Sequence, residues 1–457
     1  MQLEQVDVVV IGAGPAGMSA AIAASDAGAS VVLLDEQATP GGQIYRAVTE
    51  SDPQRLALLG PDYAAGGDLA KAFAASGARY ERGVAVWEVT REHRVNGMQN
   101  GGVRAWQAKR VVLATGAMER PFPIPGWTLP GVMTAGAAQI LLKTTQAVPQ
   151  DGLVLAGCGP LLYLLGWQYL RAGVKIRAIV DTTERADYLR AARHAGGALR
   201  GWPMLAKGLK LMAALRAAKI PFHSGASDLA VEGSERAQAL RFKIGGREQR
   251  IDADVVLLHQ GVVPNTQISW SLRAEHDWDD EQLCWRPQTS AWYELSTPGI
   301  FIAGDGAGIG GALAAATQGR LAGLEVARQC DHIDEAQRDR LAAPLRQELS
   351  GQLAIRPFLD ALYRPKHRVP ADSVTVCRCE EVTAGDIRAH VDLGCSGPNQ
   401  AKAFGRCGMG PCQGRMCGLT VTEVIADARK VAPAEVGYYR IRPPIKPVTL
   451  GGLARES

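Results

Sequence analysis

The order of apolar and polar positions near the N-terminus predicts half of a nucleotide-binding fold. Val6–Ile11 is almost entirely apolar and does not alternate, which is typical of a strand buried on both faces of a parallel sheet. The pattern then predicts a helix at Met18–Ala27 and a second strand at Ser30–Leu34. A glycine-rich turn joins the first strand to the helix.

The same order returns in the middle of the chain. A strand is predicted at Leu153–Ala156, a helix at Leu161–Ala172 and a further strand at Val174–Val180. Later, Gly299–Gly306 predicts another buried strand that ends in a Gly-Asp pair, and a helix is expected over Ala312–Gln329. Two such units predict two nucleotide-binding domains.

The first turn has the sequence Gly-Ala-Gly-Pro-Ala-Gly. Gly12 permits the tight turn, Gly14 lets the backbone approach a pyrophosphate, and Gly17 lets helix and strand pack closely. Asp35 ends the second strand 18 residues after Gly17, where a carboxylate can bond ribose hydroxyls, and the adjacent Glu36 is the alternative. A glycine-rich turn without a ligand is the competing interpretation, and the acid at this distance argues against it.

Three further motifs resemble those of glutathione- and thioredoxin-reductase-like flavoproteins. They are Ala114-Thr115-Gly116, Gly304-Asp305 and Gly41-Gly42-Gln43. The resemblance implies an α/β fold with two dinucleotide-binding domains and FAD at the first site, with Asp305 bonding the ribityl chain. The predicted contacts of this site are Gly12, Gly14, Pro15, Ala16, Gly17, Asp35, Glu36, Gly42, Gln43, Thr115, Gly116, Gly304 and Asp305.

The second turn departs from the nucleotide-binding pattern. Gly157 and Gly159 are present, but Leu162 stands where the third glycine belongs, and a branched side chain there is expected to crowd a pyrophosphate. One interpretation is NADH binding, with Asp181 rejecting a 2′-phosphate. The favoured interpretation is a retained scaffold, either empty or occupied by another adenine nucleotide.

The dithiol motifs of those reductases are absent. Residues 131–138, where thioredoxin-reductase-like enzymes carry Cys-x-x-Cys, contain no cysteine, and no Cys-x4-Cys follows the first helix. Cys158 stands alone in an apolar turn, which predicts a packing role. Dithiol chemistry is therefore excluded.

Charge and hydropathy exclude other classes of function. The 50 Lys and Arg nearly balance the 46 Asp and Glu, and no basic block is evident along the chain, so nucleic-acid binding is not expected. Glu4 and Asp7 stand where a secretion signal needs positive charge, and no later apolar segment is long enough to cross a bilayer. We expect a cytoplasmic protein that can be peripheral to the inner membrane through its partners.

Six of the nine cysteines lie between Cys377 and Cys417. A Cys-x-Cys pair and a Cys-x4-Cys pair suit a two-iron cluster with two thiolates per iron. Four thiolates also satisfy structural zinc, but the Cys-x-Cys spacing favours [2Fe–2S]. Cys407 is set aside as a bystander and Cys395 is assigned to the core. The predicted ligands are Cys377, Cys379, Cys412 and Cys417.

The order of these motifs resembles one family along nearly the whole chain. It comprises the α subunits of bacterial opine dehydrogenases (opine oxidases), hydrogen cyanide synthase, and heteromeric D-hydroxyproline or proline dehydrogenases. The segment Met409–Cys417 and the Cys-x-Cys pair are similar to bacterioferritin-associated ferredoxin. In that pattern the ligands fall on the four predicted cysteines, and the position of Cys407 is not required. The tail Arg442–Pro447 resembles the family's ending and predicts an arm that docks on a subunit.

The resemblance implies a division of labour between subunits. An amino or imino acid would be oxidised on a β subunit of the D-amino-acid-oxidase kind, and this chain would receive the electrons through the cluster and FAD. It also allows FMN at a subunit interface and a small third subunit. No catalytic residue is assigned to this chain. The alternatives are a self-contained NADH-dependent reductase and a scaffold whose cofactors serve assembly alone.

The expected organisation follows from these motifs. A small, mostly α-helical C-terminal domain completes the two nucleotide-binding domains, and Thr383-x-x-Asp386 predicts the start of a short amphipathic helix within it. The predicted boundaries are 1–128 with 288–330 for the FAD-binding domain, 129–287 for the second domain, 331–370 for a charged helical linker, and 371–457 for the [2Fe–2S] domain and tail.

Overall fold

The first domain is built on a seven-stranded sheet in which five strands run parallel to the first strand and one, within a β-meander, runs antiparallel. The computed structural model describes residues 3–366 and 369–454. The last strand of the sheet, β19 (Ile300–Ile302), comes from far along the chain and pairs parallel with β6. The remaining strands, in sheet order, are β3 (Arg79–Arg82), β2 (Val31–Asp35), β1 (Leu3–Ile11), β6 (Gly102–Leu113), β5 (Arg94–Gln99) and β4 (Ala85–Val89).

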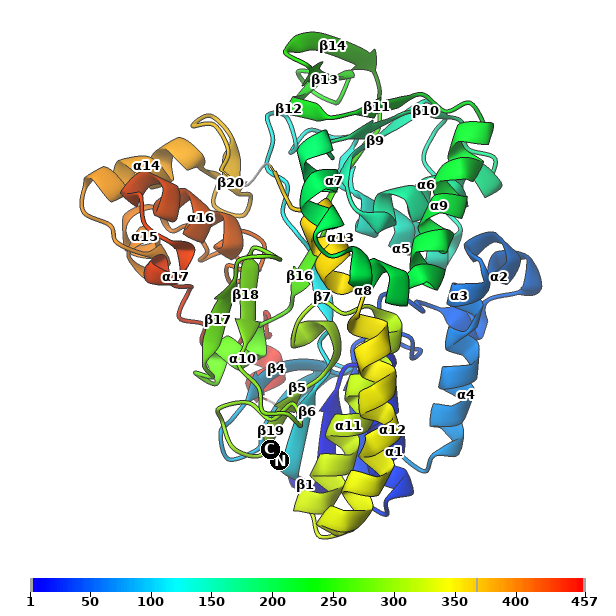
Figure 1. Ribbon diagram of the computed structural model, residues 1–457. Coiled ribbons are helices and arrows are strands. Elements are labelled where there is room, and N and C mark those ends of the chain that lie inside the picture. The colour runs from blue at the N-terminus through cyan, green and yellow to red at the C-terminus, as the bar shows by residue number, and fades with distance from the viewer. Residues whose placement is uncertain (1–2, 367–368, 455–457) are drawn as a thin grey trace.

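Helices cover this sheet on the side away from the small domain (Figure 1). α1 (Pro15–Asp26) and α11 (Ala312–Gln329) cross so closely that a Cβ on Gly319 would lie 2.1 Å from the Ala16 carbonyl oxygen. Because glycine has no Cβ, the two backbones can meet. The predicted bounds of α11 are confirmed, and α1 begins three residues earlier than expected. α4 (Gly66–Ala75) packs on α1 and α12 (Glu335–Leu353) packs on α11, whereas α2 (Pro53–Leu59) and α3 (Pro61–Ala64) lie beside the second domain.

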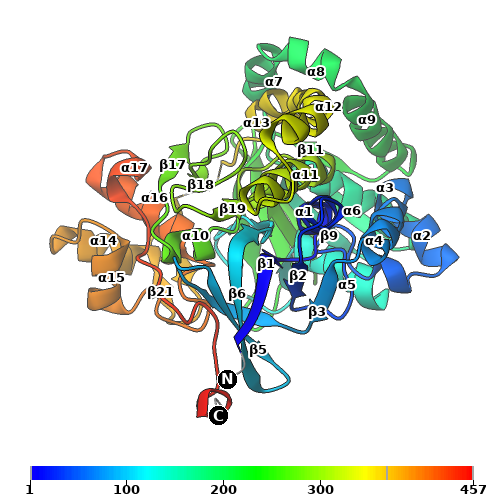
Figure 2. The same cartoon turned by 90° about the horizontal axis from the view of Figure 1, so that it is seen from below.

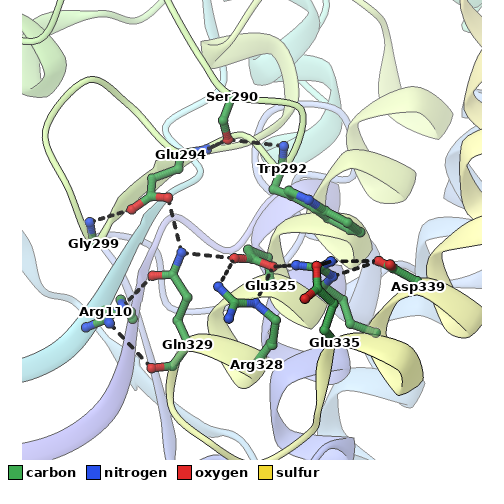
Figure 3. A network of polar contacts seen from close by, with 11 residues as sticks. Arg110, Ser290, Trp292, Glu294, Gly299, Glu325, Arg328, Gln329, Glu335 and Asp339 are labelled. Carbon is green, nitrogen blue, oxygen red and sulfur yellow. Dashed lines mark hydrogen bonds and ion pairs between the residues drawn. The ribbon is translucent and has the colours of Figure 1, made fainter.

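A polar network around Glu325 fastens α11 to α12 and to the loop before β19 (Figure 3). The buried Glu325 carboxylate accepts hydrogen bonds from Arg338 at 2.7 Å and from Arg328 at 2.6 Å. Gln329 then joins Arg110 of β6 to Glu294 of the loop. A buried carboxylate is stable only with such partners, so the network holds α11 in one position against the sheet.

The second domain contains a five-stranded parallel sheet. Its order is β11 (Phe222–Ser224), β10 (Ile176–Asp181), β9 (Leu153–Cys158), β15 (Val256–Gln260) and β8 (Val132–Thr134). Its helices are α5 (Ala135–Thr145), α6 (Pro160–Arg171), α7 (Arg185–Ala192), α8 (Ala195–Arg200) and α9 (Trp202–Ala217). A three-stranded antiparallel sheet lies beside it, formed by β12 (Ala226–Glu232), β13 (Ala239–Ile244) and β14 (Arg247–Asp252).

Short elements connect the two domains. β7 pairs antiparallel with β16 at the crossover, and β17 pairs with β18 in a hairpin next to the small domain (Figure 1). These connectors are β7 (Ala117–Glu119), β16 (Val262–Pro264), α10 (Gln267–Ser271), β17 (His276–Asp279) and β18 (Cys284–Pro287).

The C-terminal domain is small and largely helical. Its first helix begins at Thr383, whose hydroxyl accepts from the Asp386 N–H while the Asp386 carboxylate accepts from the Thr383 N–H, which confirms the predicted helix start. The domain comprises β20 (Thr375–Cys377), β21 (Val382–Thr383), α14 (Ala384–Asp392), α15 (Pro398–Gly405), α16 (Gly418–Arg429) and α17 (Pro433–Val436). Its core is continuous with that of the first domain, so the two pack as one body.

The tail lies on this chain's own first domain. The Ile445 N–H donates to the Trp87 carbonyl oxygen of β4 at 3.0 Å, and the Lys446 ammonium pairs with Glu36. The short helix α18 (Leu450–Ala454) then contacts Met98 of β5 through Gly452. The backbone bond and the ion pair hold the tail on its own chain, and its docking on another subunit stays a prediction.

Among residues 3–366 and 369–454, no helix is both long and apolar enough to cross a bilayer.

Candidate cofactor sites

The first glycine-rich turn has the backbone that a dinucleotide needs. Gly12 has a φ of +105°, which an L side chain rarely adopts. A Cβ on Gly17 would lie 1.8 Å from the Gly12 carbonyl oxygen, and α1 starts immediately after Gly14 with Pro15 in its first turn. The free N–H groups of α1 therefore open onto a surface that side chains do not obstruct.

The carboxylates of Asp35 and Glu36, the two candidates for binding the ribose hydroxyls, contact different parts of the chain. Asp35 accepts from the Ala13 N–H at 2.5 Å and from the Gln37 N–H at 2.7 Å, so its carboxylate braces the turn. Glu36 pairs with Lys446 of the tail. Of the two, Asp35 is the one directed at the glycine turn, as the sequence predicted.

The loop after β2 closes over the turn. The Gly41 N–H donates to the Ala13 carbonyl oxygen at 2.8 Å, and a Cβ on Gly42 would lie 2.7 Å from the Gly14 Cα. Arg46 follows this loop, half buried, and its Nε has no hydrogen-bond partner within the ranges that the structure describes. Burial lowers the pKa of Arg46, and the nearby Asp35 opposes that shift. An orphaned cationic nitrogen beside the turn suits a phosphate.

Lys143 of α5 is a member of this site that the sequence analysis missed. Its ammonium is buried and donates to the Gln43 carbonyl oxygen at 3.0 Å and to Gln139 Oε1 at 2.9 Å. Both acceptors are neutral. Burial, with a smaller contribution from the Arg46 charge, lowers the pKa of Lys143 from 10.5 to about 7. The loop at Gln43 is thus held by a lysine from the second domain.

The burial of Lys143 predicts a stability that depends on pH. Between pH 7 and 10.5 the unfolded chain binds the Lys143 proton more strongly than the folded chain does, so the free energy of unfolding rises with pH across this window. Below pH 7 both the folded and the unfolded chain bind the Lys143 proton, so the cost of burying the charged ammonium is present in full. We expect Lys143→Met to raise the free energy of unfolding at pH 6–7 by a few kcal/mol and to flatten its rise towards pH 10. Urea unfolding at several pH values measures both effects.

A matched control is Lys71→Met, because Lys71 is exposed. Equal pH dependence of the parent and of Lys143→Met would contradict the assignment.

The remaining predicted contacts of the first site lie at the ends of neighbouring strands. Gly304 follows β19, and a Cβ there would lie 2.7 Å from the Cβ of Ala16. Asp305 Oδ1 accepts from the N–H groups of Gly310 and Gly311, both at 2.9 Å, at the start of α11. Gly304 and Asp305 thus lie near the first turn of α1, and the bond of Asp305 to the ribityl chain stays a prediction.

Thr115 and Gly116 form the crossover side of the site. The Thr115 hydroxyl donates to the Asn265 carbonyl oxygen at 3.1 Å, and the Asn265 N–H donates to the Gly116 carbonyl oxygen at 2.9 Å. This turn therefore joins the two domains as well as lining the first site.

In the second domain the glycine turn packs against the end of β15. A Cβ on Gly157 would lie 1.7 Å from the His259 carbonyl oxygen, and Leu162 is completely buried in the core beneath α6. Asp181 is buried too: it accepts from the Tyr163 hydroxyl at 2.5 Å and from the Thr183 N–H at 2.8 Å. Burial raises the pKa of Asp181 despite these bonds.

The linker after α12 covers this turn. α13 (Arg356–Leu362) packs on α7, and the Tyr363 ring lies 6.3 Å from the Tyr163 ring. Lys366 pairs with the buried Asp187 at 2.9 Å. Two glycines, one in α8 and one just after it, leave room for the linker. A Cβ on Gly197 would lie 2.2 Å from the Ala354 carbonyl oxygen, and a Cβ on Gly201 would lie 2.6 Å from the Ile355 Cβ. The predicted linker is helical, and it fastens onto the second domain.

A cavity of about 150 Å³ is left between this linker and the turn. Its lining includes Gly159, His259 and Tyr363. His259 Nδ1 lies 2.6 Å from Glu119 Oε1, and Glu119 Oε2 accepts from the Gly136 N–H at 2.7 Å. Typical pockets for small-molecule ligands measure roughly 300–1,000 Å³, so this space is too small for a dinucleotide. The Cys158 thiol is buried beside the linker, and burial raises its pKa to about 12, as a packing role requires.

Three thiols of the C-terminal domain form a buried group. The sulfurs of Cys377, Cys407 and Cys417 all lie within 4.8 Å of one another. Cys407, which the sequence analysis set aside, is therefore a neighbour of two predicted ligands. Hydrogen bonds from Cys407 and Cys417 hold the pKa of Cys377 well below its ordinary value. A thiolate stabilised before any ion arrives suits a soft metal centre.

The other two predicted ligands form a second pair. The Cys379 and Cys412 thiols interact with each other, and Cys379 is exposed. A Cβ on Gly410 would lie 2.2 Å from the Cys379 Cβ, so the glycine lets the two loops meet. Cys395 is buried apart from these groups and its thiol contacts the Gly397 carbonyl oxygen, which agrees with its assignment to the core.

Tyr439 closes the cysteine group from the tail side. Its hydroxyl donates to the Cys407 carbonyl oxygen at 2.9 Å, and Cβ atoms on Gly408 and Gly414 would lie 2.5 and 2.6 Å from its side chain. Both glycines also have positive φ. The glycines of this loop are therefore required by the packing of Tyr439.

Direct contacts join the cysteine domain to the rest of the chain. Glu423 of α16 lies 3.7 Å from Arg120 at the crossover, and both side chains are buried. The Trp127 indole N–H donates to the Thr375 carbonyl oxygen at 2.8 Å, close to Cys377. The cysteine group is thus held rigidly beside the junction of the two nucleotide-binding domains.

The fold and the glycine turns define an oxidoreductase with two dinucleotide-binding domains. Residues 6–329 match the family model described as pyridine nucleotide-disulphide oxidoreductase, and residues 372–456 match the sarcosine oxidase A3 domain. L-proline dehydrogenase from P. horikoshii has the same fold, with a TM-score of 0.72 and 18% identity over all of this chain and 81% of that one.

Two similar proteins identify the family within this class of oxidoreductases. The A subunit of opine oxidase from Rhizobium meliloti is 46% identical over 98% of this chain and 87% of its own length. The HcnB subunit of hydrogen cyanide synthase from Pseudomonas aeruginosa is 32% identical over 96% of each chain. The chain belongs to the family of opine oxidase A subunits, which confirms the resemblance drawn from its motifs.

Proposed function

We propose that this chain is the electron-transfer subunit of a heteromeric oxidoreductase, with FAD in the first domain and a [2Fe–2S] cluster in the C-terminal domain. The substrate is an amino or imino acid of the opine, D-hydroxyproline, proline or glycine class. It is oxidised on a partner flavoprotein subunit of the D-amino-acid-oxidase kind. FMN at the subunit interface and a small third subunit belong to the same proposal.

The observation that carries the proposal is the buried thiol group beside the nucleotide-binding domains. Cys377, Cys407 and Cys417 lie within 4.8 Å of one another in a domain that shares its core with the first sheet. When bound, a flavin exchanges one or two electrons and a cluster exchanges one, which is the chemistry that the two sites would supply.

The residues of the first domain fit a dinucleotide. Gly12, Gly14 and Gly17 leave the start of α1 open, and Asp305 holds the start of α11 towards the same place. The unpartnered Arg46 Nε supplies a cation beside the turn. These groups would bind and orient the pyrophosphate, while Lys143 fixes the loop at Gln43.

The residues of the second domain do not fit NADH. Asp181 is committed to Tyr163 and Thr183, and the linker leaves only about 150 Å³ over the turn. We therefore propose that Gly157, Gly159 and Asp181 form a retained scaffold and that electrons come from the partner subunit.

An anaerobic titration tests this proposal. NADH added to the purified chain with its bound cofactors is expected to leave the flavin absorbance unchanged, whereas dithionite reduces both the flavin and an iron–sulfur chromophore. With the partner subunit present, an opine is expected to reduce both. Stoichiometric bleaching by NADH would instead identify a pyridine-nucleotide reductase.

A further inference from the structure

Helices α7 to α9 form an outer layer of the second domain that is rich in cations and has few acids. Figures 1 and 2 both show this layer at the rim of the molecule. The chain contains no Asp or Glu between Tyr188 and Ser227, although it has 46 acids in total. The same stretch contains seven Lys and Arg residues: Arg190, Arg193, Arg200, Lys207, Lys210, Arg216 and Lys219. This block escaped the sequence analysis because the net charge of the whole chain is only +4.

Helix α9 turns its apolar stripe away from the protein. Leu215 is the single buried residue among its 16 positions, although most of its side chains are apolar. At 100° per residue, Trp202, Leu209 and Ala213 fall within about 40° of one another on the side opposite to Leu215. Trp202 is 63% exposed and Leu209 is 59% exposed. The apolar residues of α9 are spread around the helix, and this exposed stripe is covered by no described part of the chain.

Cations flank the stripe. Arg200 precedes Trp202, and Lys210 lies next to Leu209; both are exposed. Neither forms an ion pair with any described residue, unlike Lys207, which is paired with Asp62 of α3. Leu199 of the neighbouring helix α8 is 73% exposed as well. We name the five residues Leu199, Arg200, Trp202, Leu209 and Lys210 the α9 face.

The chemistry of the α9 face determines its occupant. Two copies of an acid-free cationic face repel each other, which disfavours a second copy of this chain. Protein interfaces are depleted in Lys, whereas helices that lie on membranes combine Lys and Arg with exposed Trp and Leu. We propose that the α9 face docks on an anionic lipid bilayer surface, with Trp202 and Leu209 entering the interface and Arg200 and Lys210 contacting headgroups.

Vesicle co-sedimentation of the full chain with its cofactors tests the proposal. We expect binding to vesicles of equal phosphatidylglycerol and phosphatidylcholine, little binding to pure phosphatidylcholine, and weakening at high salt. Each cation near an anionic surface contributes about 1 kcal/mol, or about fivefold in affinity. The double variant Arg200→Glu/Lys210→Glu should therefore bind at least about 25-fold more weakly. The double variant Trp202→Ser/Leu209→Ser should bind the anionic vesicles weakly at low salt and at high salt alike.

Matched controls lie on other surfaces. Arg247→Glu in β14 and Leu393→Ser after α14 change an exposed cation and a 70% exposed leucine, and both should bind vesicles as the parent does. Circular dichroism checks that every variant is folded. The proposal is overturned if the parent ignores anionic vesicles, or if α9-face variants bind them normally. The proposal is also overturned if the α9-face variants no longer bind a partner subunit but still bind the vesicles. That result would identify the α9 face as a protein interface.

Discussion

Serine in place of Cys377 is expected to remove the metal centre from the purified chain. Cys377 lies at the middle of the buried thiol group, and it is the thiol whose charged form the neighbouring cysteines stabilise. A serine oxygen binds iron much less readily than a thiolate. Iron and sulfide content and the iron–sulfur part of the visible absorption should fall to near zero, whereas flavin content and the flavin absorption should be unchanged.

Three further serine variants identify the ligand set. Cys395→Ser is the matched control, because Cys395 is buried in the same domain but apart from the group, and it should retain the metal. Cys412→Ser should lose the metal and Cys407→Ser should retain it if the predicted ligands are correct. The reverse result for these two would replace Cys412 by Cys407. Zinc without iron or sulfide in the parent chain would refute the cluster.

Alanine in place of Gly17 is expected to abolish flavin binding. The added Cβ would lie 1.8 Å from the Gly12 carbonyl oxygen, so either α1 or the turn must move. Both groups line the place of the pyrophosphate, and the free N–H groups of α1 would no longer converge there. The ratio of flavin to protein after purification should fall at least tenfold.

Gly208→Ala is the matched control for this change. Gly208 lies within α9 and nothing stands within 4 Å of its missing Cβ. This variant should keep its flavin and gain about 0.5–1 kcal/mol of stability, because alanine loses less entropy than glycine in a helix. Full flavin content in Gly17→Ala would contradict the location of the site.

The features that the sequence predicted are those that local chemistry determines. Continuous apolar runs predicted β1 and β9, and Thr383 with Asp386 predicted the start of α14. The glycines of the first turn were predicted because each solves a steric problem within its own strand–turn–helix unit. Such constraints involve residues close in sequence, so they can be recognised without the fold.

The features that the sequence did not predict depend on distant segments. Lys143 reaches Gln43 from 100 residues away, and nothing around it distinguishes it from a surface lysine. The contacts of the linker with α7 and α8 join residues more than 150 positions apart. Cys407 was set aside because the family pattern omits it, whereas its proximity to Cys377 arises from the packing of Tyr439 on the glycine loop.

The pairing of β19, which comes late in the sequence, with β6 has a consequence for biosynthesis. The N-terminus of a nascent chain leaves the ribosome first. The sheet that contains β1 nevertheless lacks β19 until Ile302 has been translated. The contact between Lys446 and Glu36 cannot form until Lys446 has been translated. The nascent first domain therefore leaves the ribosome with the Val111–Leu113 end of β6 unpaired on one side, and any flavin taken up during translation would bind an incomplete site. Chaperone contact during this interval is expected to concentrate on the first 113 residues.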